Sequence, residues 1–185
     1  MEITIKRFTD WQRVVNATRM TVGKEPIDHE PSDKFKHMIC RSEHSPLRLL
    51  EFDIILKDVP SFVQNQIVRH KQGVEFFVCS SRPDRGNQKP RSEQRKTDPC
   101  DMQISINAQA ILNISRKRMC RKAEGATRLW WQRVIYELGK IEPILASYCW
   151  PDCVYKSKCT EAEPCGWWEK HKEQFNNSNN ENTKS

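Results

Sequence analysis

The tripeptide Arg69-His70-Lys71 is the group of residues in this chain best suited to chemistry, because it joins two cations to an imidazole. A second loop carries residues 79–82, and a helix-like segment farther on carries Asn107, Asn113 and Arg118. Guanidinium groups are forked donors that match phosphate oxygens, and amides and hydroxyls add further hydrogen bonds. If folding brings these three stretches together, they predict a binding site for a phosphorylated ligand.

The elements that must position these residues can be predicted from hydrophobic spacing. Residues 47–57 predict a strand whose alternate residues share one face, and residues 61–68 predict a short helix capped by Ser61. Residues 104–119 predict one helix, and residues 123–146 predict a second helix, which Pro143 either kinks or marks in its last turns. Further predicted elements are an edge strand over residues 1–7, helices starting near residues 11 and 33, and a long charged loop over 82–99. We therefore expect an α+β fold, a helical bundle with a small antiparallel sheet built around residues 47–57.

Composition indicates a single domain with an anionic partner. The 185 residues fit the usual domain size of about 100 to 200 residues, and a net charge of +7 favours nucleotides or nucleic acids. The hydrophobic share is only 37%, which is typical of a domain that oligomerises or carries solvated loops. No apolar stretch approaches the roughly 20 residues that span a bilayer, and residues 1–6 lack the apolar centre of a signal peptide. We therefore expect a cytoplasmic protein without membrane contact, whose cysteines are thiols or metal ligands rather than disulfides.

The order and spacing of these residues resemble the flavin-dependent thymidylate synthases. That family carries Arg-His-Arg, seven variable positions and then serine, and here Arg69-His70-Lys71 stands at the corresponding place. Glu43-His44 stands 25 positions before Arg69, as the family's upstream Glu-His does, and Gln66 stands where the family has a glutamine that contacts the nucleotide. The spacings of six and five among Asn107, Asn113 and Arg118 match the family's helix between flavin and nucleotide. The resemblance covers roughly residues 8 to 148, and it identifies the chain as a divergent member.

Two departures from the family pattern concern the loop after the tripeptide. Lys71 replaces the second arginine, and Cys79 stands where the serine is expected. A one-residue insertion would let Ser80-Ser81-Arg82 match the family's Ser-x-Arg. The acidic residue that the family carries shortly before this serine is absent, and residues 76–78 are apolar instead. Cys79 itself could be an activated thiol between cations or a small buried hydrophobic residue.

The resemblance implies a fold, a reaction and an assembly. FAD is reduced by NADPH, and a one-carbon unit from methylenetetrahydrofolate is transferred to carbon 5 of dUMP and reduced, which yields dTMP. The enzyme is a homotetramer with active sites shared between subunits. Arg118 activates the pyrimidine, because a guanidinium beside nitrogen 3 and its adjacent oxygen stabilises developing negative charge. The resemblance assigns nucleotide binding to Gln66, Arg69, Ser80, Ser81, Arg82, Arg91 and Arg118. It assigns flavin binding to Arg69, His70, Lys71, Asn107, Gln109 and Asn113.

The C-terminal region lies outside this resemblance. We divide the chain into a synthase-like domain over residues 1–148, a Cys/Trp-rich extension over 149–170 and a disordered tail over 171–185, where Asn, Ser, Glu and Lys dominate. Four thiolates can hold zinc or an iron–sulfur cluster, and the extension carries Cys149, Cys153, Cys159 and Cys165. Tight Cys-x-x-Cys pairs are absent, so we assign no metal ligand from the sequence.

Two other functions remain open from the sequence. A sister enzyme could attach a hydroxymethyl or other group to a pyrimidine nucleotide with the same flavin site, and Lys71 and the missing acid favour this alternative. A basic nucleic-acid-binding module with a cysteine-bound metal would also account for the positive charge, although we consider a nucleic-acid partner the weaker interpretation. A flavin spectrum in the purified protein distinguishes the enzymes from the binding module.

Overall fold

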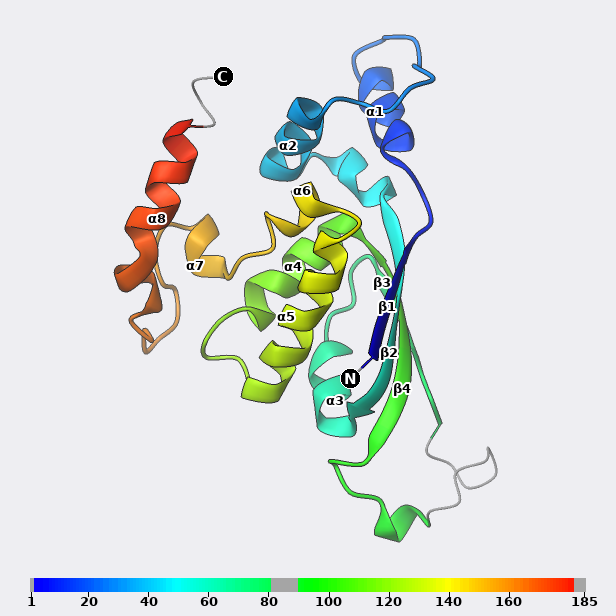
Figure 1. Cartoon of the computed structure of the whole chain (residues 1–185), viewed down its shortest axis with the longest axis vertical. Coiled ribbons are helices and arrows are strands. Elements are labelled where there is room, and N and C mark those ends of the chain that lie inside the picture. The colour runs from blue at the N-terminus through cyan, green and yellow to red at the C-terminus, as the bar shows by residue number, and fades with distance from the viewer. Residues whose placement is uncertain (1, 81–89, 182–185) are drawn as a thin grey trace.

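The computed structural model describes residues 2–80 and 90–181, and within the loop 90–98 and the last helical turns it leaves the side chains of Arg91 and of residues 176–181 undescribed. A four-stranded antiparallel sheet forms one layer, and helices cover one of its faces (Figure 1). The strands are β1 (Glu2–Arg7), β2 (Glu51–Pro60), β3 (Val74–Val78) and β4 (Pro99–Asn107), in the spatial order β1-β2-β4-β3.

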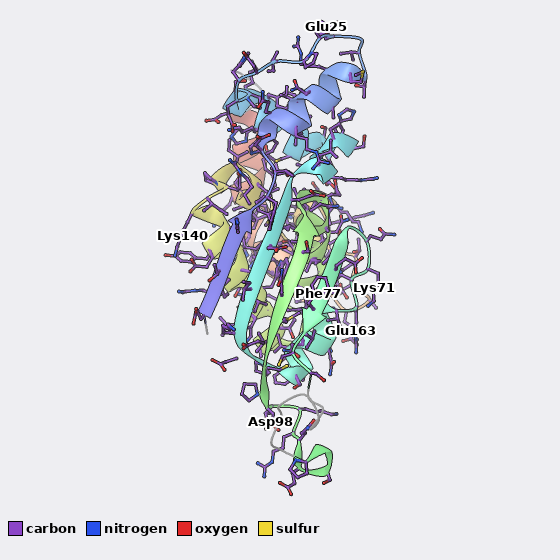
Figure 2. The ribbon with its side chains drawn as sticks, turned by 90° about the vertical axis from the view of Figure 1, so that its right-hand side faces the viewer. Glu25, Lys71, Phe77, Asp98, Lys140 and Glu163 are labelled. Carbon is purple, nitrogen blue, oxygen red and sulfur yellow. The ribbon has the colours of Figure 1, made fainter. Side chains whose placement is uncertain are left out.

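The two central strands form the sheet side of the core, because their apolar residues alternate and therefore share one face. Phe52, Ile54 and Leu56 of β2 are fully buried, and they pair in register with Ile106, Ile104 and Met102 of β4. No helix covers the opposite face, as Figure 2 shows from the side away from the helices, and that face carries both polar side chains and the exposed Ile55 and Phe77. On that face Gln103 donates a hydrogen bond to Asp53 across the two strands (2.7 Å).

The helical layer is built from short elements. The α-helices are α1 (Trp11–Met20), α2 (Asp33–Ser42), α3 (Ser61–Ile67), α4 (Ala108–Arg118), α5 (Gly125–Gly139), α6 (Pro143–Ala146), α7 (Asp152–Tyr155) and α8 (Trp167–Glu181), and the 3₁₀ helices are η1 (Ser45–Leu49) and η3 (Arg91–Glu93). Helices α3, α4 and α5 lie against the sheet (Figure 1). Side-chain caps start three of the longer helices: Asp10, Ser32 and Asn107 each accept a hydrogen bond from the backbone N–H three residues on.

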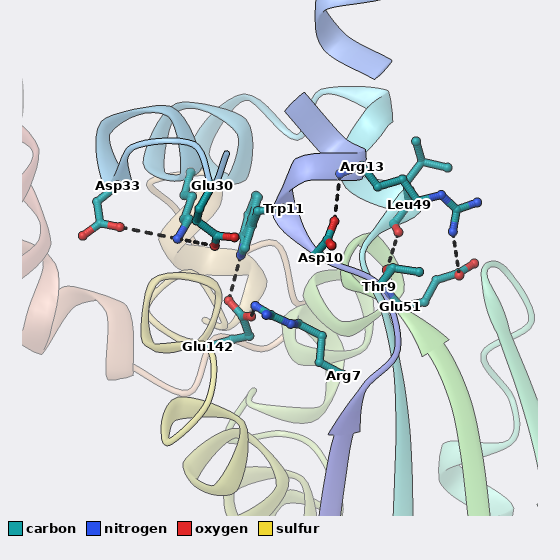
Figure 3. Close-up of polar contacts among 11 residues, drawn as sticks. Arg7, Thr9, Asp10, Trp11, Arg13, Glu30, Asp33, Leu49, Glu51 and Glu142 are labelled. Carbon is teal, nitrogen blue, oxygen red and sulfur yellow. Dashed lines mark hydrogen bonds and ion pairs between the residues drawn. The ribbon is translucent and has the colours of Figure 1, made fainter. Parts of the chain in front are cut away.

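A buried carboxylate fastens the N-terminal strand and α1 to the helical layer (Figure 3). Glu142, just before α6, accepts a hydrogen bond from Nε1 of Trp11 (2.9 Å) and forms an ion pair with Arg7. Trp11 is fully buried, so this contact fixes where α1 begins. Thr9 donates to the carbonyl of Leu49 (2.6 Å), which ties the same segment to η1.

The structure confirms the predicted fold class and the sheet built around β2, and it corrects several element boundaries. Residues 45–49 form a 3₁₀ helix, so the strand predicted from residue 47 begins at residue 51. The helix predicted from residue 104 begins at residue 108, because residues 99–107 alternate as strand β4 and run directly into α4. Strand β3 was not predicted. The helix predicted over 123–146 is two helices, since Pro143 starts α6 instead of bending one continuous helix.

The C-terminal region is helical where its composition predicted a disordered tail. Helix α8 runs to residue 181, and the ring of Phe175 packs against Trp150 (ring centroids 5.0 Å apart) and Trp167 (5.9 Å). Packing of these aromatic rings against one another stabilises the first turns of a helix whose later composition is polar. The domain boundaries at residues 148 and 170 stay predictions. Within the part of the chain that the structure describes, no helix combines the length and the apolar character that crossing a membrane requires.

Candidate functional site

The ends of α3 and α4 meet at Arg118, and this contact forms the centre of the candidate site. Nε of Arg118 donates to Nε2 of His70 (3.2 Å), and Nη1 donates to Oε1 of Gln66 (3.3 Å). The third nitrogen, Nη2, donates to the backbone carbonyl of Gln66 at the end of α3. Arg118 is thus held by two residues of the first predicted stretch. His70 lies 48 positions before it in the sequence and Gln66 lies 52 positions before it.

The electrostatics of this contact favour an anionic ligand. Partial burial and the charge of nearby Arg69 lower the pKa of Arg118, which stays charged near neutral pH because its ordinary pKa is so high. Burial and the charges of Arg118 and Lys117 lower the pKa of His70 to about 4. His70 is therefore neutral at pH 7, and since Nε2 accepts from Arg118, its proton is on Nδ1. The result is a patch of fixed positive charge with a neutral imidazole beside it, which suits phosphate and ring oxygens.

This pKa leads to a prediction about acid stability. Between about pH 6.5 and pH 4 the unfolded chain binds a proton at His70 and the folded chain does not, so the free energy of unfolding falls as the pH is lowered through this range. We expect His70→Gln to flatten that fall, measured as the thermal unfolding midpoint at several pH values. His29→Gln, at an exposed loop position, is the matched control and should leave the pH dependence as it is in the unmodified chain. If the unfolding midpoints of all three proteins fell equally with pH, the folded chain would bind a proton at His70 over the same pH range as the unfolded chain, and its pKa would not be lowered.

A second polar cluster lies on another face of α4. Glu43, the residue that follows α2, has a left-handed backbone conformation. It forms an ion pair with Arg116 and accepts a hydrogen bond from Gln109 (2.5 Å). Asn113 accepts from Arg116 (3.1 Å) and from Gln109 (3.3 Å), and the guanidinium of Arg116 lies over the ring of Tyr155, 4.2 Å from its centroid. Nε of Arg116 is buried and has no hydrogen-bond partner among the described residues. A buried donor without an acceptor costs about 1–3 kcal/mol, so a ligand acceptor reaching this atom would be stabilising.

A close backbone contact joins the loop after the tripeptide to the start of α4. The backbone N–H of Asn107 donates to the carbonyl of Gly73 (3.0 Å), and its side chain accepts from the N–H of Ala110 (2.9 Å). Gly73 has φ +70°, and a Cβ at this position would lie 2.4 Å from Nδ2 of Asn107. The loop can therefore approach α4 this closely only because residue 73 has no side chain.

The structure brings some of the predicted site residues together and separates others. Gln66, His70 and Arg118 are in contact, and Arg69 is near enough for its charge to act on Arg118. Gln109 and Asn113 lie on the far side of α4 from Arg118. At about 100° per residue, Asn113 is turned by roughly 140° and Gln109 by roughly 180° from Arg118 around the helix axis. Asn107 lies at the opposite end of that helix, about 16 Å away along its axis at about 1.5 Å per residue.

The predicted phosphate loop is only partly described. Cys79 is tied to β4, since its backbone N–H donates to the carbonyl of Asp101 (2.9 Å) and its own carbonyl accepts from the thiol of Cys100 (3.0 Å). Gln64 of α3 in turn donates to the carbonyl of Cys100 (2.7 Å), so the part of β4 that contacts Cys79 is also tied to α3. Ser81 and Arg82, as well as the side chain of Arg91, are outside the described residues. Lys71 is exposed at the end of the tripeptide.

Sequence reasoning missed the roles of Arg116 and Tyr155. The sequence places Arg116 among several basic residues on an exposed face, but it is largely covered and paired with Glu43. The spacing of Gln109, Asn113 and Arg116 at intervals of four and three is the signal that could have found this cluster. Nothing in the sequence indicates that Tyr155, from a helix of four residues, would stack on it.

A hollow on the other side of the sheet does not suit a phosphorylated ligand. It has a volume of about 600 Å³ and lies on the open face over β2, β4 and β3. Its lining includes the carboxylates Glu51, Asp53 and Glu75. Three carboxylates repel phosphate, so the site at Arg118 remains the candidate.

Comparisons with known proteins agree on the fold. No protein-family model and no curated protein sequence matches this chain. Among solved structures, it is similar to the flavin-dependent thymidylate synthase ThyX from Helicobacter pylori complexed with FAD and dUMP, with TM-score 0.69 and 16% identity over 81% of this chain and 100% of that chain. A second structure of the same synthase with FAD and dUMP gives TM-score 0.66 at 16% identity over 80% and 99%. The UMP/dUMP methylase PolB from Streptomyces cacaoi, bound with 5-Br dUMP, gives TM-score 0.61 at 14% identity over 80% and 94%. The chain therefore has the fold of the flavin-dependent thymidylate synthases, at low sequence identity.

Proposed function

We propose that this chain is a flavin-dependent thymidylate synthase that converts dUMP to dTMP with FAD, NADPH and methylenetetrahydrofolate. The contact of Arg118 with Gln66 and His70 carries the proposal, because it joins the motif after α3 to the motif on α4 in a fold that dUMP-binding and FAD-binding proteins share. Bound FAD, once reduced by NADPH, would supply the hydride that completes the methyl group.

The residues at the site fit such ligands. The guanidinium of Arg118 would lie beside the uracil ring and stabilise the negative charge that develops at nitrogen 3 and its adjacent oxygen. Gln66 fixes the guanidinium through two hydrogen bonds, which reduces the reorganisation needed when charge develops. Arg69 and Lys71 are exposed cations at the mouth of this patch, where they can receive phosphate groups. Nδ1–H of neutral His70 is a donor suited to a flavin carbonyl.

The separation of the two polar clusters on α4 favours a shared site. One ligand cannot contact Arg118 and the Asn113 side of the same helix together, because the two faces point apart. In a homotetramer, Gln109, Asn113 and Asn107 of one subunit would hold flavin against the Arg118 patch of another. The open sheet face, with Phe77 exposed, offers apolar surface for such contacts. We infer the tetramer from this separation and from the family resemblance, and a cytoplasmic location stays a prediction.

The decisive experiment combines a spectrum with an assay. The purified chain should show the absorption of bound FAD, and it should convert dUMP to dTMP when NADPH and labelled methylenetetrahydrofolate are supplied. Omitting NADPH should prevent turnover, because oxidised flavin has no hydride to transfer. A colourless protein that binds DNA or RNA in a salt-dependent manner, with no turnover of any pyrimidine nucleotide, would instead support the nucleic-acid-binding alternative.

A related nucleotide methylase is the second candidate. The structural similarity to a UMP/dUMP methylase, together with Lys71 in place of the family's arginine, favours an altered nucleotide specificity. Assaying dUMP, UMP and the cytidine monophosphates in parallel separates the candidates. Turnover of UMP or a cytidine nucleotide without turnover of dUMP would replace the proposed substrate while leaving the flavin chemistry in place.

Arg69 provides a test of ligand binding separate from chemistry. We expect Arg69→Ala to weaken both dUMP and FAD by about tenfold or more, because a charge-assisted hydrogen bond contributes about 1.5–3 kcal/mol. Flavin fluorescence and calorimetry measure the two dissociation constants. Arg133→Ala, which removes an exposed arginine on α5, should leave both unchanged. Unaltered affinity for both ligands in Arg69→Ala would contradict the bridging position of Arg69.

A further inference from the structure

Four cysteines from separate stretches of the chain line one cavity beside α8. The cavity has a volume of about 270 Å³, and residues from the end of α4, from α5, from α7 and from the segment that leads to α8 line it. Its thiols are those of Cys120, Cys153, Cys159 and Cys165. Three tryptophans, Trp150, Trp167 and Trp168, also line it. We call this space the cysteine cavity.

This set differs from the one that the sequence suggested. Cys149 precedes Cys153 closely in the sequence, but it is buried in the main core, where its thiol donates to the carbonyl of Leu145 (3.5 Å). It does not line the cysteine cavity. Cys120 replaces it, because the turn after α4 lies beside α7 in space although 33 positions separate Cys120 from Cys153.

The surroundings favour ionised thiols once a cation is present. The backbone N–H of Lys122 donates a hydrogen bond to Sγ of Cys120 (3.5 Å). Arg116, Arg121 and Arg128 line the cavity and outnumber its acidic residues, Asp152 and Glu161, although Arg116 is also paired with Glu43. A divalent cation held by four thiolates carries a net charge of −2, which such positive groups offset.

Without a cation the thiols disfavour one another's ionisation. Burial raises the pKa of the Cys153 thiol to about 11, and the neighbouring sulfur groups of Cys120, Cys159 and Cys165 contribute to that shift. Each of the other three thiols is therefore near enough to Cys153 to act on its charge.

We propose that the four thiols of the cysteine cavity bind one zinc ion as a structural site. Among the residues that the structure describes, no group of three potential metal ligands is close enough together to hold an ion. Zinc binding must therefore move the four sulfurs toward one another. Residues 156–166 can follow, because they form turns and irregular backbone between α7 and α8. A surface ion pair between Lys122 and Glu163 (3.6 Å) also holds this segment to the turn after α4, and exposed pairs of this kind contribute little. The metal would thus cross-link α8 to the end of α4, independently of whether the chain acts on nucleotides.

Cobalt titration of the full chain tests the proposal directly. The protein is reduced, freed of metal with a chelator and titrated with Co²⁺ as the probe. We expect one equivalent per chain to bind with the thiolate charge-transfer and visible bands of tetrahedral cobalt, and zinc to displace it. Absence of these bands would overturn the site. Iron and sulfide in anaerobically purified protein, with a brown colour, would overturn zinc as the metal.

Single substitutions identify the ligands. Cys120→Ser and Cys165→Ser should each weaken cobalt binding by more than about 100-fold, which exceeds the usual effect of losing an outer-shell partner. Cys149→Ala and Cys79→Ser are the matched controls and should keep full affinity. Cys165 is exposed, so its replacement leaves the fold of the metal-free chain intact, which circular dichroism can verify. Full affinity in Cys120→Ser, or lost affinity in a folded Cys149→Ala, would overturn the assignment of the fourth ligand.

Discussion

Replacing Arg118 with alanine is expected to lower kcat for dUMP methylation by about 100- to 1,000-fold while bound FAD is retained. The magnitude is that of removing one preorganised donor from a site where negative charge develops. The preorganisation is visible in the structure: all three guanidinium nitrogens have acceptors, and all of these acceptors belong to Gln66 or His70. The side chain is thus held in one orientation before a substrate arrives.

A matched set of variants separates this role from a structural one. Arg118→Lys keeps a positive charge but not the planar fork, so it should recover only part of the activity. Added guanidinium at low millimolar concentration should partly restore Arg118→Ala, since the space that the side chain leaves is bounded by the same acceptors. Arg133→Ala, on the exposed surface of α5, should retain full activity.

The measurement must allow for a modest loss of stability. Arg118 also satisfies the carbonyl of Gln66 at the end of α3, and one such hydrogen bond contributes about 1 kcal/mol. Turnover should therefore be measured well below the unfolding temperature of each variant, with the flavin spectrum recorded in the same samples. Undiminished kcat in a folded, flavin-bound Arg118→Ala protein would remove Arg118 from the chemistry.

Residue spacing predicted the contact between the tripeptide and the end of α4 more successfully than it predicted the elements around it. The types and spacing of Arg69, His70 and Arg118 are constrained by chemistry, and the structure confirms that their two stretches meet. Strand β4 was missed because it passes into α4 without a turn, so the alternation up to Ile106 merged with the helical spacing after it. Asn107 was the one local signal of the boundary, since asparagine is a preferred N-cap.

Contacts between elements that are distant in the sequence could not be predicted from the sequence alone. The pairing of Glu43 with Arg116 requires α2 to end in a left-handed residue (φ 48°) and α4 to lie beside it. In the same way, proximity in the sequence grouped Cys149 with the later cysteines, whereas core packing buries it and brings Cys120 to the others. Short-range spacing identifies residues on one helix face, but it cannot identify the partner that arrives from another element.

The loop that carries the tripeptide can be tested through Gly73. We expect Gly73→Ala to lower the free energy of unfolding by about 2–3 kcal/mol and to weaken FAD and dUMP together. Left-handed backbone costs a residue with a side chain about 1–2 kcal/mol, and displacing Asn107 from the start of α4 costs about 1 kcal/mol more. Urea unfolding gives the stability, and flavin fluorescence gives the affinity.

Two other glycines separate the causes. Gly23 has a similar φ of +66°, and a Cβ at this position would have no neighbour within 4 Å, so Gly23→Ala should show the backbone cost alone, about 1–2 kcal/mol. Gly125 has neither a positive φ nor a close neighbour, so Gly125→Ala should cost nothing. Combining Gly73→Ala with Asn107→Ala should destabilise by less than the sum of the two, because the contact is then absent. Equal losses for Gly73→Ala and Gly23→Ala would show that the approach of this loop to Asn107 does not determine the position of the tripeptide.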